Sequence, residues 1–197
     1  MRAAGRAALA ACALALGGCG YFSWFKSADE KPMPLAEIRA TVTPRVAWSA
    51  SVGRAGGFKF FPRLEAGRVF TAAADGTVTV LDAESGRQAA RFDAGRKLSS
   101  GAGGQGESII VGTIKGEVAA YDLAGKSLWV ANVGGEVLAP VVVAGSTAVV
   151  RTADGRIFAL GLADGKRRWV YQRPTPALLL RAETAVLVTP TNVVAGY

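Results

Sequence analysis

The sequence contains no histidine and only two cysteines among its 197 residues, and these absences exclude most common catalytic and metal sites. Without histidine there is no Ser-His-Asp or Cys-His constellation and no His-ligated metal or haem. The glycine-rich GAGGQG at 101–106 lacks the strand-then-helix context of a phosphate site, so we interpret it as a loop between strands. We therefore expect neither catalysis nor a cofactor or metal.

Clusters of basic residues interleaved with aromatics are also missing, although Lys and Arg outnumber Asp and Glu by 23 to 15. The basic excess is spread along the chain, which argues against a nucleic-acid partner. The one short basic run, at 166–168, is interpreted as a solvated strand end or turn.

The N-terminus has no apolar run long enough to cross a bilayer. Arg2 and Arg6 precede an apolar run over 7–16, shorter than the roughly 20 residues that a spanning helix needs. A short basic region followed by such a run is typical of a signal peptide, here residues 1–18. Its alternatives are a plain secretory signal without lipid and a short membrane anchor.

The residues that end this segment are Leu16-Gly17-Gly18-Cys19, which resemble a bacterial lipobox. The resemblance implies cleavage before Cys19 and lipidation of its thiol, which would leave the mature chain without a free cysteine. Gly20 stands where an aspartate would favour retention in the inner membrane. We therefore expect a lipid anchor on the periplasmic face of the outer membrane.

Residues 19–43 are expected to form a tether rather than part of the folded body. Aromatic residues lie at 21–25, where they favour either the membrane interface or packing on the following domain. The stretch 27–34 is charged and interrupted by proline, which is typical of a linker. The folded domain is expected to occupy 44–197.

That domain repeats itself at intervals of about 40 residues. Two glycine series and one largely aromatic series keep this period. The first glycine series is Gly76, Gly116 and Gly155, and the second is Gly86, Gly125 and Gly165; the anchor positions are Trp48, Ala90, Trp129 and Trp169. A repeat of this length predicts a solenoid or propeller built from one supersecondary unit.

Each repeat holds short β-rich segments separated by glycine turns. The expected strands are 69–74, 78–82, 108–113, 118–121, 148–152 and 157–160. No segment of the body has a convincing helical period. Four short antiparallel strands per repeat predict an all-β fold, a β-propeller whose blades stack face to face and bury the recurring aromatic ring between them.

The repeat resembles the PQQ-like propeller family, whose motif is A-x-D-x-x-T-G-x-x-x-W, in the segments VLDAESGRQAA and AYDLAGKSLW. The copies are degenerate: Ala90 replaces the tryptophan of one repeat and Gly161 the aspartate of another. One alternative function within this family is a quinone-dependent dehydrogenase or its remnant. The missing histidines and cysteine pair count against it.

The lipobox followed by these repeats resembles the BamB family of the outer-membrane β-barrel assembly machinery. In that family a loop of the form P-S-L-x-L-R-G-E-S docks on a POTRA domain of the barrel protein BamA. The segment PTPALLLRAET matches it, with Ala182 in place of the glycine, so the resemblance implies BamA binding through Leu178, Leu180, Arg181 and Glu183. The residues alone favour an inner strand of the fourth blade for 177–180, and only the resemblance favours the docking loop.

The resemblance implies a non-catalytic scaffold that assists the folding and insertion of β-barrel proteins, with BamA, the rest of the Bam complex and unfolded outer-membrane proteins as partners. A further alternative is a generic periplasmic propeller that binds peptides or cell-wall sugars. The family propeller has eight blades, whereas these repeats supply three and the start of a fourth. We therefore expect an open arc, a fragment of a longer protein, that exposes strand edges and self-associates.

Overall fold

The computed structural model describes residues 35, 41–172, 184–189 and 191–196. Two units, Met1–Pro44 and Arg45–Tyr197, separate by their internal contacts, and the described elements all lie in the second. Within the described ranges every regular element is a β-strand, and no helix there is long and apolar enough to cross a membrane.

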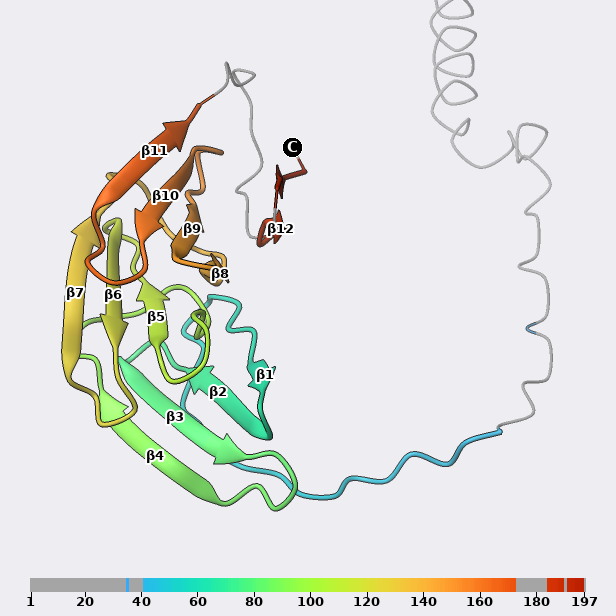
Figure 1. The fold of residues 1–197 in the computed structure, drawn as a ribbon. Coiled ribbons are helices and arrows are strands. Elements are labelled where there is room, and N and C mark those ends of the chain that lie inside the picture. Colours follow the sequence, from blue (N-terminus) through green and yellow to red (C-terminus); the bar gives the residue numbers. More distant parts are fainter. Residues whose placement is uncertain (1–34, 36–40, 173–183, 190, 197) are drawn as a thin grey trace, which may run out of the picture. The chain divides into compact units, whose positions relative to one another are not determined.

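The strands form three antiparallel sheets and one hairpin in chain order (Figure 1). The first sheet contains β1 (Arg63–Glu65), β2 (Arg68–Ala72), β3 (Thr77–Asp82) and β4 (Gln88–Asp93). The second contains β5 (Ile109–Gly112), β6 (Glu117–Tyr121) and β7 (Ser127–Asn132). The third contains β8 (Val142–Ala144), β9 (Thr147–Arg151), β10 (Ile157–Gly161) and β11 (Arg167–Tyr171), and the hairpin contains β12 (Leu187–Val188) and β13 (Val193–Val194).

The three sheets repeat one pattern in detail. In each, the register shifts by one residue between the outermost strand and its neighbour, at Val80/Leu81, Ala120/Tyr121 and Ala159/Leu160. A glycine with positive φ, such as Gly76 at +108°, closes the turn before that neighbouring strand. The predicted all-β class of four-stranded antiparallel sheets is confirmed, and we refer to the sheets as blades 1, 2 and 3.

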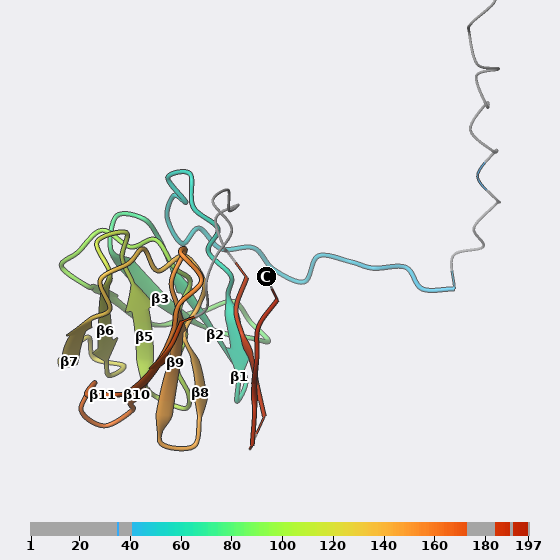
Figure 2. The same cartoon turned by 90° about the horizontal axis from the view of Figure 1, so that it is seen from above.

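The apolar core lies between the blades and not within any one of them. One buried cluster joins blade 1 to blade 2 through residues such as Phe70 and Ile109, and a second joins blade 2 to blade 3 through residues such as Ile110 and Leu160. A third, smaller cluster joins blade 3 to the β12–β13 hairpin. Figure 2 shows the blades side by side from above. Each blade is thus stabilised by its neighbours, because a single four-stranded sheet leaves both faces open.

The GAGGQG segment does more than connect strands, so its interpretation as a loop was incomplete. Gly103 forms an antiparallel bridge with Ile110 and thereby supplies the innermost strand position of blade 2. A Cβ on Gly103 would overlap the carbonyl oxygen of Val141, at the start of blade 3. Glycine is required here because the innermost backbones of two blades approach this closely.

Candidate functional site

Aromatic rings lie on turn glycines where one repeat meets the next. The Trp129 ring of β7 covers Gly165 of blade 3, and its indole N–H donates a hydrogen bond of 2.7 Å to the Leu162 carbonyl. The Trp48 ring covers Gly86 of blade 1 in the same way, and its N–H donates to the Ala83 carbonyl at 3.0 Å. A Cβ on either glycine would lie 2.5 Å from ring carbon. These two tryptophans therefore fix the spacing between successive repeats.

The joint between blades 1 and 2 is made by a residue that the repeat alignment does not identify. Ala90 does occupy the anchor register, since it pairs with Val80 as Trp129 pairs with Ala120. The ring that covers Gly125 nevertheless belongs to Phe92, two residues further along the same face of β4. The aromatic side chain thus lies two residues after the anchor position, and it still contacts Gly125 of the next blade.

Trp169 occupies the same register in β11, where it pairs with Ala159. It is 42% exposed, against 8% for Trp129. Among the glycines that the structure describes, none lies beneath its ring.

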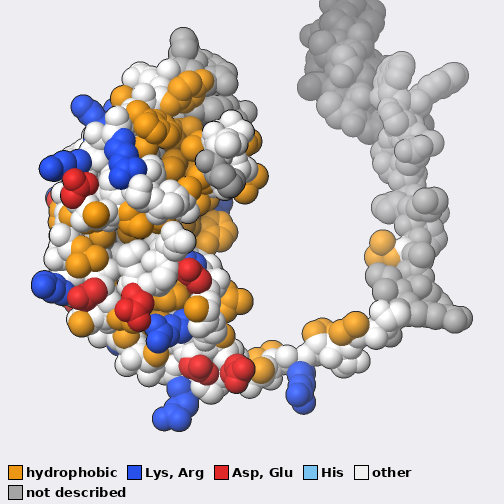
Figure 3. Space-filling model, in the orientation of Figure 1, with side chains coloured by type: hydrophobic (Ala, Val, Ile, Leu, Met, Phe, Trp, Pro, Cys, Tyr) orange, Lys and Arg blue, Asp and Glu red, His pale blue; other side chains and the backbone are white. Residues whose placement is uncertain are grey.

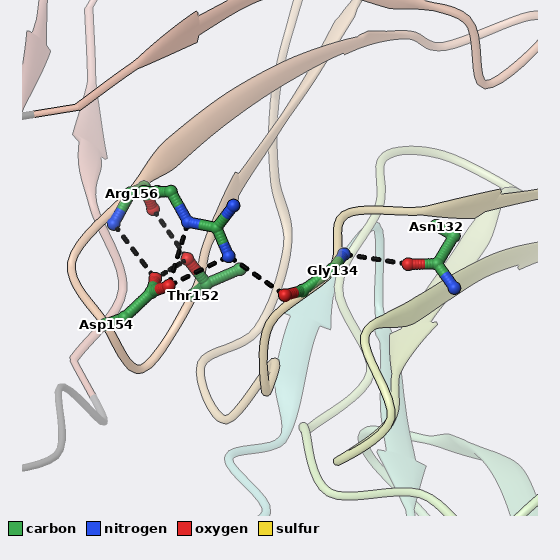
Figure 4. Close-up of polar contacts among 5 residues, drawn as sticks. All are labelled: Asn132, Gly134, Thr152, Asp154 and Arg156. Carbon is green, nitrogen blue, oxygen red and sulfur yellow. Dashed lines mark hydrogen bonds and ion pairs between the residues drawn. The ribbon is translucent and has the colours of Figure 1, made fainter.

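A polar contact joins blade 2 to blade 3 at the turn between β9 and β10 (Figure 4). Arg156 donates to a carboxylate oxygen of Asp154 at 2.8 Å and to the Gly134 carbonyl at 2.9 Å, and Gly134 donates its own N–H to Asn132. Partial burial opposes ionisation of Asp154, but hydrogen bonds from Thr152 and the charge and hydrogen bonds of Arg156 outweigh it and lower the Asp154 pKa. The turn is held in place by an ionised carboxylate.

An open groove of about 860 Å³ lies between blade 3 and the β12–β13 hairpin. Ile157 and Val149 lie on the blade side of the groove and Val193 on the hairpin side, with Trp169 and Tyr171 at its outer strand. Hydrophobic side chains gather at the end of the molecule that carries β8 to β12 (Figure 3).

Arg151 binds Thr184, the first described residue after 183. Its side chain is buried, with 5% of the residue exposed, at the end of β9. The guanidinium donates to the Thr184 hydroxyl at 3.1 Å and to the Gly196 carbonyl at 2.5 Å. A buried arginine with a forked pair of acceptors fixes both groups in place. The residue is one that sequence reasoning missed, because an arginine at a strand end carries no motif.

Five of the predicted functional residues lie outside the described residues: the lipidation site Cys19 and the partner-binding residues Leu178, Leu180, Arg181 and Glu183. Where the structure is described, no three His, Cys, Asp or Glu side chains are grouped closely enough to hold a metal ion. The basic run 166–168 lies in the turn before β11 and at its start, and it is exposed as predicted.

Comparison with known proteins identifies the repeat. Residues 74–197 match the family model described as outer membrane protein assembly factor BamB. The outer membrane protein assembly factor BamB of Bordetella pertussis is 40% identical over 185 residues, covering 93% of this chain and 47% of that protein.

The chain belongs to the BamB family.

A second BamB family member, the assembly factor of Nitrosomonas eutropha, is 39% identical over 186 residues, covering 92% of this chain and 46% of its own length. The chain spans about half the length of the curated relatives it matches. Both relatives are named for the assembly of outer membrane proteins and not for a reaction.

Solved structures support the fold. The crystal structure of BamB from Moraxella catarrhalis matches with a TM-score of 0.58 at 26% identity, over 66% of this chain and 39% of that one. A quinohemoprotein alcohol dehydrogenase from Comamonas testosteroni matches with a TM-score of 0.53 at 20% identity, over 64% of this chain and 22% of that one. The match to the dehydrogenase shows only that the two proteins share the fold of these blades.

Proposed function

We propose that this chain is a non-catalytic scaffold of the outer-membrane β-barrel assembly machinery, which assists the insertion of barrel proteins by binding BamA. The observation that carries the proposal is the match to assembly factors, which covers 93% of the chain for one relative and residues 74–197 for the family model. The absence of histidine from the sequence separates it from the haem-containing quinone enzymes that share the fold.

The docking segment in this proposal is 177–183, with Leu178 and Leu180 as apolar anchors and Arg181 and Glu183 as their charged, hydrogen-bonding rim. Interfaces concentrate their binding energy in a few such residues. Arg151 supports the role because it fixes Thr184, the next residue along the chain, to the rigid strand β9. A segment held at its exit loses less conformational entropy when a partner binds it.

The remaining parts of the proposal concern the N-terminus. Residues 1–18 direct export, Cys19 carries the lipid, and 19–43 tether the domain 44–197 to the periplasmic face of the outer membrane. The Bam complex and unfolded outer-membrane proteins are the proposed partners of the anchored scaffold.

Co-purification of BamA with the tagged chain from outer-membrane extracts tests the docking segment. Leu178→Asp and Leu180→Asp each place a charge at an apolar anchor, so the recovered BamA should fall by tenfold or more. Leu187→Asp in β12 is the matched control, because Leu187 is 66% exposed and lies just after the segment. Undiminished recovery with both anchor variants would remove the docking segment from the proposal.

The lipid anchor is tested separately. Cys19→Ser should move the chain out of the outer-membrane fraction and abolish the mass added by the lipid, while BamA binding in detergent extract is retained. An unchanged membrane fraction would show that something other than Cys19 holds the chain there.

A further inference from the structure

A groove of about 450 Å³ lies between blades 2 and 3 on their outer side. Residues 130–133, at the end of β7, line it from blade 2, and residues of β10 and 164–167 line it from blade 3. Phe158 and Leu160, both buried, form its floor. Since both belong to the cluster between these blades, the groove opens directly onto the apolar core.

The repeat allows this groove to be compared with the same place between blades 1 and 2. Counted from the turn glycine of each blade, Ala131 has the register in β7 that Phe92 has in β4. Leu160 has the register in β10 that Tyr121 has in β6, because each directly follows the shift in register. The four residues therefore make up two equivalent pairs.

Between blades 1 and 2 this pair is aromatic. The ring centroids of Phe92 and Tyr121 lie 5.4 Å apart, and both residues pack in the cluster that joins the two blades. Between blades 2 and 3 the same positions hold an alanine and a leucine. Trp129 covers Gly165 from the anchor position, two residues earlier, and it does not line the groove. The groove thus lies where the preceding joint packs an aromatic ring.

The rim of the groove carries more positive than negative charge. Lys166 and Arg167 lie there with a single acid, Asp164. The Lys166 side chain is 85% exposed and its ammonium lies 3.6 Å from the Asp164 carboxylate. An exposed ion pair of this kind is weak, so it costs little to exchange for a contact with a partner. The rim therefore favours an added carboxylate.

We propose that this groove binds an aromatic side chain of a protein partner, with an acidic residue next to it in the partner sequence. The ring packs on Ala131 and Leu160 as Phe92 packs on Tyr121 in the preceding joint. The acidic residue lies toward Lys166 and Arg167. An aromatic anchor in a pocket with a charged rim is a typical interface hot spot.

The inference goes beyond the proposed function and stands without it. The groove is lined by residues of blades 2 and 3 and by none of 177–183. The contact consists of side chains and requires no pairing of the partner with a strand.

The probe is the capped dipeptide N-acetyl-Phe-Glu-amide, titrated into the isotopically labelled whole chain carrying Cys19→Ser and followed by amide chemical shifts. The shifts should concentrate at Ala131, Gly165 and Lys166. Ala131→Phe supplies the ring that the preceding joint has, so it should weaken dipeptide binding by about tenfold. Leu128→Phe is the matched control, because it adds a ring to the opposite, half-exposed face of the same strand and should leave binding unchanged.

Two altered dipeptides test the groove without changing the protein further. N-acetyl-Ala-Glu-amide lacks the ring and should cause no shifts at the groove. N-acetyl-Phe-Lys-amide should bind about fivefold more weakly than the glutamate form, and the difference should shrink as salt is added. Equal binding of either altered dipeptide, or of the first dipeptide to the Ala131→Phe variant, would overturn the proposal.

The two proposals fail differently. A dipeptide that does not bind, with BamA recovery still dependent on Leu178 and Leu180, refutes only the groove site. Dipeptide binding at the groove, with BamA recovery indifferent to those leucines, refutes the docking segment and leaves the groove site standing.

Discussion

At the scale of residues, each contact between successive repeats contains one aromatic ring packed on one turn glycine. Gly86, Gly125 and Gly165 all have positive φ, and each lies beneath an aromatic ring of the preceding repeat. Two requirements meet at each position, because the backbone conformation disfavours a side chain and the ring leaves no room for one. The same residue type therefore recurs with the period of the repeat.

Gly165→Ala separates these requirements when it is compared with Gly145→Ala. Gly145 has a similar φ of +56° but nothing lies within 4 Å of the added Cβ, so its variant should lose only about 1 kcal/mol of the free energy of unfolding. Gly165→Ala should lose about 2–4 kcal/mol, because the Trp129 ring must also move. Urea denaturation measures both, and equal losses would show that the ring contact is unimportant.

Phe92→Ala tests the aromatic that the repeat alignment missed. Phe92 packs against the core between blades 1 and 2, and its ring lies 5.4 Å from that of Tyr121. Truncation should destabilise the protein by about 3 kcal/mol. Leu128→Ala, which shortens a half-exposed side chain on the neighbouring outer strand, should cost no more than about 0.5 kcal/mol.

An aromatic ring placed at position 90 instead of 92 should restore the contact with Gly125 between blades 1 and 2. Phe92→Ala combined with Ala90→Trp reproduces the arrangement of Trp129 and Ala131 in β7. The double variant should recover part of the stability lost in Phe92→Ala. No recovery would mean that Gly125 does not accept a ring from the anchor register.

The sequence predicts the glycines of these joints but not all of their rings. Glycine spacing is visible because a positive φ admits few other residues. A ring two residues away on the same face of a strand covers the same glycine, so Ala90 broke the aromatic series while Phe92 preserved the contact. Packing of this kind depends on the pleat of the strand and has no fixed position in a linear motif.

At the scale of elements, the turns do more than reverse the chain. The β9–β10 turn links blade 3 to the Gly134 carbonyl of blade 2 through Arg156, which Asp154 orients. Since the Asp154 pKa is lowered in the folded protein, its ionised form stabilises the fold. That contribution is complete above the unfolded pKa of about 4 and is lost as pH falls through the folded value.

Asp154→Asn should therefore destabilise the protein at pH 7, and the difference from the unmodified chain should shrink as pH falls below about 4. Urea denaturation at pH 7, 5 and 3 measures this difference. A difference that stays constant over this range would indicate that only the shape of the turn matters.

Arg151 acts at the same scale by joining β9 to the residues on either side of the hairpin. Arg151→Lys keeps the positive charge but cannot donate to both acceptors as the planar guanidinium does. Thr184 would then be held less firmly, and the docking segment would lose more conformational entropy when BamA binds. BamA binding should therefore weaken by about tenfold. Phe92→Ala is the control for stability alone, because it destabilises a distant joint. Equal BamA affinity in the two variants at matched stability would refute the positioning role.

The middle strands of each blade could be predicted from the sequence, since β2, β3, β5, β6, β9 and β10 begin and end within two residues of the six expected segments, whereas the bounds of the outermost strands were not predicted. Their alternation and glycine turns are local signals. The inner strand position at Gly103 was not predicted, because glycines there serve the close approach of two backbones and look like a loop in the sequence. The Arg151 contacts join residues up to 45 positions apart, which no local pattern reveals.

At the scale of the whole molecule, the blades are successive copies of one unit, each packed mainly on its neighbours. This arrangement is shared with enzymes and assembly factors alike, so the fold does not choose the function. The proposed function rests instead on the family match and on the segment 177–183, which the resemblance suggests as the docking site. The proposed scaffold thus places a short docking segment on a rigid, repetitive support.

Titration of the periplasmic POTRA domains of BamA with the whole chain carrying Cys19→Ser, followed by calorimetry, tests this account most directly. Arg181→Ala should raise the dissociation constant about 30-fold, the effect of losing about 2 kcal/mol at an interface hot spot. Arg167→Ala on β11 should leave it unchanged. An Arg181→Ala variant that binds as tightly as the Arg167→Ala control would contradict the account.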